Sequence, residues 1–159
     1  MLCYASAHGL PVRKRLAHFI PHWIDGRVSF FITINCLPRG RNQLCHPDVC
    51  AKVLATIQFY HEHLKWQAVL LLLMPDHMHG IVSFPRDPGM KGVIKAWKGY
   101  QKRFHGIEWQ DDFFDHRLRD RFQFDEKCSY ILNNPVRKGL CEKPEDWPYV
   151  FWPQDRAVF

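Results

Sequence analysis

The feature that most constrains the fold is an apolar stretch near the middle of the chain that is interrupted only once. Trp66 to Leu73 is an apolar run apart from Gln67, which is typical of a strand buried on both faces. Residues 74–76, Met-Pro-Asp, break this run, and His77 to Phe84 resumes it as a second strand. Because the break is short, the sequence predicts a hairpin of two buried strands.

A strand and a helix are predicted before this hairpin. Val28 to Cys36 is rich in β-branched and aromatic residues, a composition that favours a strand. From Pro47 to about Lys65 the apolar residues recur at steps of three and four, which indicates an amphipathic helix. These apolar positions are Val49, Val53, Ile57, Tyr60 and Leu64.

Three further elements are predicted after the hairpin. Met90 to Phe104 has helical spacing, and Phe113 to Leu118 is a short candidate strand. Arg119 to Asn133 is predicted to be a helix. We expect Pro135 to end it, because proline has no backbone N–H to donate.

The resulting order is β-α-β-β-α-β followed by one helix. This order predicts an α+β fold, a ferredoxin-like (RRM-like) sandwich with an appended C-terminal helix. The 159 residues suffice for one domain with a core. We expect an N-terminal arm at 1–22, the domain at 23–143, and a Trp- and Pro-rich tail at 144–159 that packs on the domain without regular structure.

The charge balance favours a polyanionic partner. The chain has 22 Lys and Arg against 16 Asp and Glu, a net charge of +6. Four lysines recur on one side of the second predicted helix, and they represent either a DNA contact or a solvated face. The candidate DNA-binding residues are Lys91, Lys95, Lys98, Lys102, Arg103, Arg117, Arg119 and Arg137, with Lys138 adding charge beside them.

The cysteines and the hydropathy indicate a cytoplasmic protein. None of the six cysteines forms a C-x-x-C pair, so the sequence favours reduced, mostly buried thiols. A zinc site or a disulfide framework is the alternative. The longest apolar run is far shorter than a membrane span, and no targeting segment is visible. We therefore expect no membrane partner.

Two histidines at the start of a predicted strand could bind a metal ion. His77 and His79 lie two positions apart, so their side chains point to the same face of the strand. Two imidazoles held in this way can share one divalent cation. The alternative is a pair of hydrogen-bonded histidines at a strand edge. His61 and His63 have the same spacing on a predicted helix, where they diverge too far to bind one ion.

The last predicted helix carries a tyrosine and an asparagine on one side. Tyr130 and Asn134 are four residues apart, which is about one turn. An asparagine carbonyl oxygen is a suitable ligand for Mg²⁺ or Mn²⁺, and a tyrosine beside such an ion could act as a nucleophile. The alternative is a half-buried core tyrosine followed by an ordinary Asn-Pro helix stop.

The motifs that contain these residues resemble those of one enzyme family. The segment 74–79, Met-Pro-Asp-His-Met-His, resembles the HUH motif of the single-tyrosine transposases. The segment 130–140, Tyr-Ile-Leu-Asn-Asn-Pro-Val-Arg-Lys-Gly-Leu, resembles the tyrosine motif of the REP-associated branch. Residues 109–119 and 144–148 are also similar to that branch, and the likeness extends from about His22 to Pro153.

This resemblance implies a function and a site. It implies cleavage of single-stranded DNA near hairpins of repetitive palindromic elements, with a 5′-phosphotyrosine intermediate. His77, His79 and Asn134 would bind Mg²⁺ or Mn²⁺, Tyr130 would be the nucleophile, and the protein would act as a monomer rather than a homodimer. Two alternatives are a hairpin-binding protein of the same descent that does not cleave, and a metal hydrolase or zinc protein unrelated to nucleic acid.

Overall fold

The computed structural model describes residues 28–153, so the predicted arm at 1–22 lies outside the described part. Most elements begin and end within three residues of their predicted bounds. In chain order they are β1 (Ser29–Asn35), α1 (Pro47–Glu62), β2 (Gln67–Met74), β3 (His77–Ser83), α2 (Gly89–His105), β4 (Phe114–Arg117), α3 (Arg121–Arg137), the 3₁₀ helix η1 (Pro144–Asp146) and β5 (Val150–Phe151).

The strands form one antiparallel sheet in the order β4-β1-β3-β2-β5. The first four strands have the order of the ferredoxin-like fold, which confirms the predicted fold class. The predicted hairpin is present as β2 and β3, joined at Pro75 and Asp76. Both of these strands lie inside the sheet, which explains why their sequences are apolar almost throughout.

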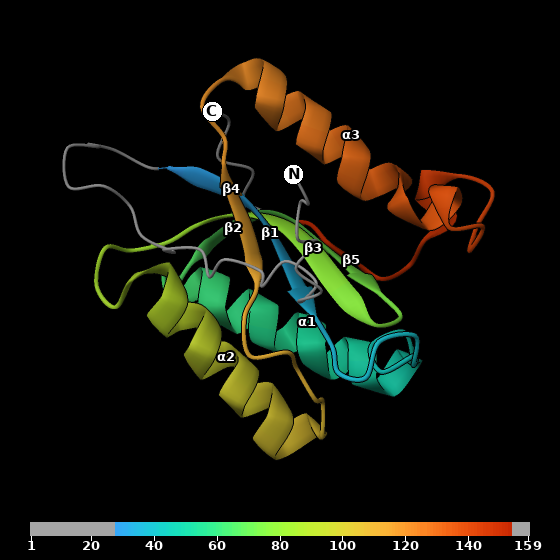
Figure 1. Ribbon diagram of the computed structural model, residues 1–159, viewed down its shortest axis with the longest axis horizontal. Helices are drawn as coiled ribbons and strands as arrows, with labels where there is room; N and C mark the ends of the chain where they lie inside the picture. Colours follow the sequence, from blue (N-terminus) through green and yellow to red (C-terminus); the bar gives the residue numbers. More distant parts are fainter. Residues whose placement is uncertain (1–27, 154–159) are drawn as a thin grey trace, which may run out of the picture.

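The helices cover opposite faces of the sheet, with α1 and α2 on one side and α3 on the other (Figure 1). The larger core lies under α1 and α2 and contains Trp66, Met78 and Trp97. A smaller apolar cluster joins the sheet to α3 and includes Leu72 and Ile131. The strands contribute side chains to both apolar clusters, because neighbouring residues of a strand point to opposite faces of the sheet.

The bounds of α3 differ from those predicted. The helix begins at Arg121, after Asp120, whose side chain accepts a hydrogen bond from the backbone N–H of Gln123 at 2.8 Å. The prediction that Pro135 ends the helix is wrong, because α3 continues to Arg137. Pro135 lacks one backbone N–H, and the loss of this single donor does not prevent the following residues from staying helical. The left-handed backbone of Gly139, with a φ of 68°, terminates the helix just after Arg137, and the backbone N–H groups of Gly139 and Leu140 donate to the carbonyls of Val136 and Pro135.

The expectation of an irregular tail is also wrong in part. Val150 and Phe151 form a short strand that pairs with β2, and the Trp147 indole N–H donates to the Leu73 carbonyl at 2.9 Å. A strand of two residues has too little pattern to be recognised in a Trp- and Pro-rich segment. Among the helices of residues 28–153, none is long and apolar enough to cross a membrane.

Candidate active site

The strand β3 places both predicted histidines on the face that α3 covers. Met78, between them, points into the larger core on the opposite face, as the alternation predicts. The rings of His77 and His79 are buried, with centroids 4.7 Å apart. The sequence-predicted pairing of the two imidazoles on one side of a strand is therefore present.

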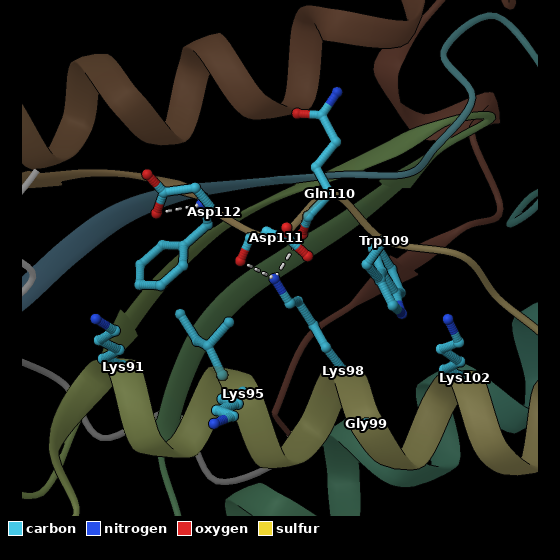
Figure 2. A pocket seen from close by; sticks show the side chains of 11 residues that line it. Lys91, Lys95, Lys98, Gly99, Lys102, Trp109, Gln110, Asp111 and Asp112 are labelled. Carbon is cyan, nitrogen blue, oxygen red and sulfur yellow. Dashed lines mark hydrogen bonds between the residues drawn. The ribbon is translucent and has the colours of Figure 1, made fainter. Parts of the chain in front are cut away.

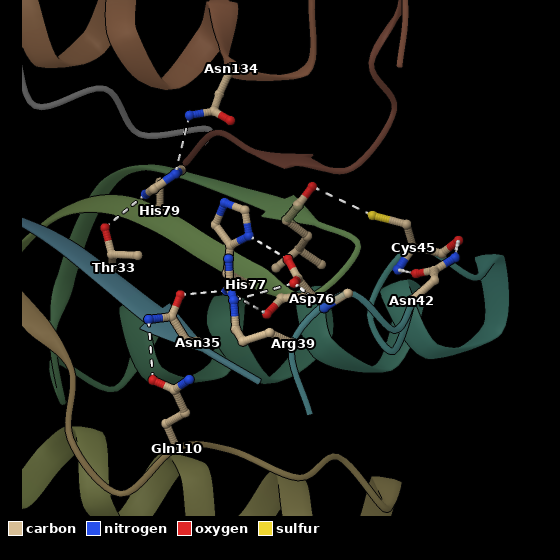
Figure 3. Close-up of polar contacts among 12 residues, drawn as sticks. Thr33, Asn35, Arg39, Asn42, Cys45, Asp76, His77, His79, Gln110 and Asn134 are labelled. Atoms are coloured by element: carbon tan, nitrogen blue, oxygen red, sulfur yellow. Dashed lines mark hydrogen bonds and ion pairs between the residues drawn. The ribbon is translucent and has the colours of Figure 1, made fainter. Parts of the chain in front are cut away.

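The helix α3 brings the other two predicted residues to the same place. The Asn134 side-chain amide nitrogen lies 3.2 Å from Nε2 of His79, and the Tyr130 ring centroid is 5.6 Å from that of His79 (Figure 3 shows His77, His79 and Asn134). Phe31 packs edge-on against Tyr130, with centroids 5.8 Å apart. Tyr130 and Asn134 are 51 and 55 positions after His79 in the sequence, yet the three residues form one cluster between the sheet and α3.

Each histidine is held through its Nδ1 atom. The Thr33 hydroxyl lies 2.8 Å from Nδ1 of His79, and the Asp76 carboxylate lies 2.7 Å from Nδ1 of His77. A carboxylate can only accept, so Nδ1 of His77 donates its proton and Nε2 keeps a lone pair. Burial lowers the pKa of His77, and it lowers the pKa of His79 to about 3. Both rings are therefore neutral near pH 7, which is the form that binds metals.

The side chains suit a hard divalent cation. Oδ1 of Asn134 is buried and has no hydrogen-bond partner among the described residues, a state that is unfavourable for a carbonyl oxygen unless a ligand satisfies it. Amide oxygen with two imidazoles is an acceptable donor set for Mg²⁺ or Mn²⁺. Within residues 28–153, no group of three His, Cys, Asp or Glu side chains could hold a metal ion, so a three-ligand site here would require the amide of Asn134.

Two cations of α3 flank the tyrosine. The Lys127 ammonium lies 5.7 Å from the Tyr130 ring centroid, and the Arg137 guanidinium carbon lies 5.3 Å from it. Two acids of the same helix, Asp125 and Glu126, have partners of their own, because Asp125 accepts from Arg121 and Glu126 pairs with Lys127. The surroundings of Tyr130 are thus suited to an anionic substrate.

The predicted lysine stripe lies on the other side of the sheet, on α2. Its four lysines line a pocket of about 390 Å³ between α2 and residues 109–113 (Figure 2). Lys98 donates to the backbone carbonyls of Gln110 and Asp111 at 2.6 and 2.7 Å, and it therefore holds the pocket wall in place. Lys102 pairs with Glu108 at 2.9 Å. The stripe and Tyr130 do not share one surface.

The remaining predicted DNA contacts are dispersed. Arg103 stacks over Phe104 on α2, Arg117 lies in the edge strand β4, and Arg119 is exposed just before α3. Of the eight basic residues proposed from the sequence, Arg137 is the one that contacts Tyr130.

Several residues of the site were missed in the sequence. Lys127 is three positions before Tyr130, and helical spacing alone could have identified it. Asp76 is adjacent to His77 but was assigned only to the turn. Thr33 and Arg39 gave no signal, because strand pairing and loop closure bring them to the histidines from far along the chain.

Comparisons with known proteins identify the family of the chain. The chain is 30% identical over 147 residues to the REP-associated tyrosine transposase of Escherichia coli strain K12, covering 89% of this chain and 86% of that protein. A Haemophilus influenzae protein with the same family name is 27% identical over 143 residues, covering 79% of this chain and 80% of the relative. No protein-family model matches the chain.

The fold is also that of a solved relative. A REP-associated tyrosine transposase bound to a REP hairpin has a TM-score of 0.69 to this structure, over 85% of this chain and 82% of that chain, at 23% sequence identity. The sequence match to the Escherichia coli protein extends over nearly the whole of both proteins. The chain therefore belongs to the REP-associated tyrosine transposases.

Proposed function

We propose that this protein cleaves and rejoins single-stranded DNA beside hairpins, with Tyr130 as the nucleophile. The observation that carries the proposal is the convergence of Tyr130 and Asn134 of α3 on His77 and His79 of β3. The names of the relatives, and the REP hairpin bound by the solved one, support DNA hairpins as the partner.

The reaction exchanges one phosphate ester for another. The Tyr130 phenol loses its proton and its oxygen attacks the phosphorus, the bond from phosphorus to the 3′-oxygen breaks, and the departing 3′-oxygen takes up a proton. Tyr130 then carries the 5′-phosphate as an ester. Because no phosphate ester is lost, a 3′-hydroxyl can attack this phosphotyrosine and rejoin the strand without ATP.

The side chains of the site divide the remaining tasks. His77, His79 and Asn134 would hold Mg²⁺ or Mn²⁺, which polarises a phosphate oxygen when bound. Lys127 and Arg137 lie where they can bind the phosphate oxygens next to Tyr130 and offset the negative charge of the transferring group. Phe31 restricts the position of the tyrosine ring.

The experiment is to capture the covalent intermediate. Protein is incubated with Mn²⁺ or Mg²⁺ and labelled single-stranded hairpins from the flanks of its own gene, and the products are separated on a denaturing gel. We expect a metal-dependent protein–DNA band from the wild type and none from Tyr130→Phe, because only the phenol oxygen can form the ester.

Other outcomes would favour the alternatives. Hairpin binding without a covalent band would indicate a binding protein that does not cleave. Metal-dependent hydrolysis that survives in Tyr130→Phe would indicate a hydrolase that activates water. Action as a monomer in the cytoplasm stays a prediction, which the mass of the protein–hairpin complex and its location in cells would check.

A further inference from the structure

The turn between β2 and β3 holds an acid that the proposed reaction does not use. Oδ1 of Asp76 accepts from Nδ1 of His77 at 2.7 Å. Its other oxygen, Oδ2, accepts from the backbone N–H of Gly40 at 2.7 Å and lies 3.3 Å from Nε of Arg39 (Figure 3). One carboxylate therefore connects His77 to the loop that follows β1.

This loop fixes the carboxylate from several directions. Arg39 donates to the side-chain oxygen of Asn35 at 2.6 Å and to the backbone carbonyl of Asp76 at 3.1 Å. Gly40 has a left-handed φ of 81°, a conformation that glycine adopts without strain. The Cys36 N–H also donates to the Asp76 carbonyl, at 2.8 Å. The acid is therefore held in place before any ligand binds.

The groups that contact the Asp76 carboxylate all carry N–H. Nδ1–H of His77 and the backbone N–H of Gly40 donate to it, and the Arg39 guanidinium forms an ion pair with it, so these surroundings favour the ionised acid. A histidine whose Nδ1–H is bound in this way directs the Nε2 lone pair away from the acid. Here Nε2 faces the space shared with His79 and Asn134 (Figure 3).

We propose that Asp76 is a positioning residue of the metal site, which fixes the tautomer and the orientation of His77 and is itself held by Arg39 and Gly40. This inference rests on the proposed function, since it assumes that His77 binds the metal ion. The competing explanation is that Asp76 only stabilises the turn. In that case its loss would lower stability but leave the tautomer of His77 unchanged.

The first test reads the tautomer in the metal-free protein. Long-range ¹H–¹⁵N spectra of the imidazole rings report which nitrogen carries the proton. We expect His77 to be protonated at Nδ1 in the wild type and to lose this preference in Asp76→Ala. His79, held by Thr33, serves as the internal reference in the same spectrum. An unchanged His77 signal in folded Asp76→Ala would overturn the proposal.

The second test is titration with Mn²⁺ alone. Loss of an orienting partner commonly weakens metal binding by roughly 10- to 100-fold, and we expect this for Asp76→Ala. Asp76→Asn keeps one acceptor oxygen and should bind Mn²⁺ more tightly than Asp76→Ala. Glu108→Gln removes an exposed carboxylate of another ion pair and should match the wild type.

The two possible failures are distinguishable. Equal Mn²⁺ affinity in the wild type and Asp76→Ala would overturn the role of Asp76 alone. No Mn²⁺ binding by the wild type would contradict the proposed metal site, and with it the need for a positioning residue. Thermal unfolding of each variant confirms that the compared proteins are folded.

Discussion

At the scale of single residues, the cations beside Tyr130 are the sharpest guide to the substrate. Lys127 is three-quarters buried and lies over the rings of both Phe31 and Tyr130. An ammonium group in this position adds little to folding, because its cation–π contacts and its ion pair with the exposed Glu126 are both weak. It is well placed to bind an anion that approaches the tyrosine.

Removal of Lys127 should therefore slow cleavage more than it weakens DNA binding. We expect Lys127→Ala to lower the rate of covalent adduct formation roughly 10- to 100-fold at saturating hairpin, since one stabilising contact to the transferring phosphate is lost. Arg121→Ala is the matched control, because Arg121 is a cation of the same helix that pairs with Asp125 away from the tyrosine. Equal loss in both variants would contradict a specific role for Lys127.

Two cysteines, the buried Cys36 and the partly buried Cys45, provide a separate test at this scale. Burial raises the pKa of Cys36 and of Cys45 to about 12. Near pH 8 an ordinary thiol is ionised to a few per cent or more, whereas these two are ionised to roughly one part in ten thousand. We expect iodoacetamide to leave both unmodified in the native protein and to modify them after denaturation, as measured by peptide mass. Rapid native modification would contradict their burial.

At the scale of elements, the tail holds the sheet and α3 together. Trp147 belongs to the smaller apolar cluster, and its indole N–H donates to the Leu73 carbonyl. We expect Trp147→Ala to lower the free energy of unfolding by about 2–3 kcal/mol, through lost apolar contacts and the lost indole hydrogen bond. Trp147→Phe keeps most of the contacts and should lose about 1 kcal/mol. Urea denaturation measures the free energy of unfolding of both variants. A smaller loss in Trp147→Ala than in Trp147→Phe would contradict this role of the indole.

The elements also show what the sequence could and could not predict. The hairpin was predictable, because two buried strands need long apolar runs. Pro135 does not predict the end of α3, because a proline removes only one backbone donor, whereas the left-handed Gly139 terminates the helix just after Arg137. For the site, the histidine pair and the pair on α3 follow from local periodicity. The roles of Thr33 and Arg39 depend on contacts between distant parts of the chain, which a local sequence pattern cannot predict.

At the scale of the whole molecule, two basic regions lie on opposite sides of the sheet. Lys127 and Arg137 flank Tyr130 on α3, whereas the lysine-lined pocket lies on α2. Side chains connect the two sides, since Asn35 donates to Gln110 in the pocket wall and accepts from Arg39 near His77. A hairpin that contacts both regions would have to pass around the edge of the sheet near β4.

The lysines of α2 should then contribute to affinity and not to chemistry. We expect joint substitution of Lys91, Lys95 and Lys102 by alanine to reduce the salt dependence of hairpin binding, by up to about 2 in the slope of log K against log salt. The covalent step at saturating DNA should be unchanged. Anisotropy titrations over a series of salt concentrations, with Tyr130→Phe as the control of unaltered charge, measure this slope. An unchanged slope would indicate that the lysines of α2 face solvent and do not contact DNA.

The strand order has a consequence for shortened chains. Both edge strands of the sheet, β4 and β5, come from the part of the chain that also contains α3. A polypeptide that stops before Phe114 would leave β1 and β2 with unpaired backbone groups and would expose the apolar face beneath α3, including Leu70 and Ile81. Such edges promote aggregation. A premature stop codon should therefore yield an insoluble product that is degraded, and not a persistent DNA-binding fragment that competes with the intact enzyme.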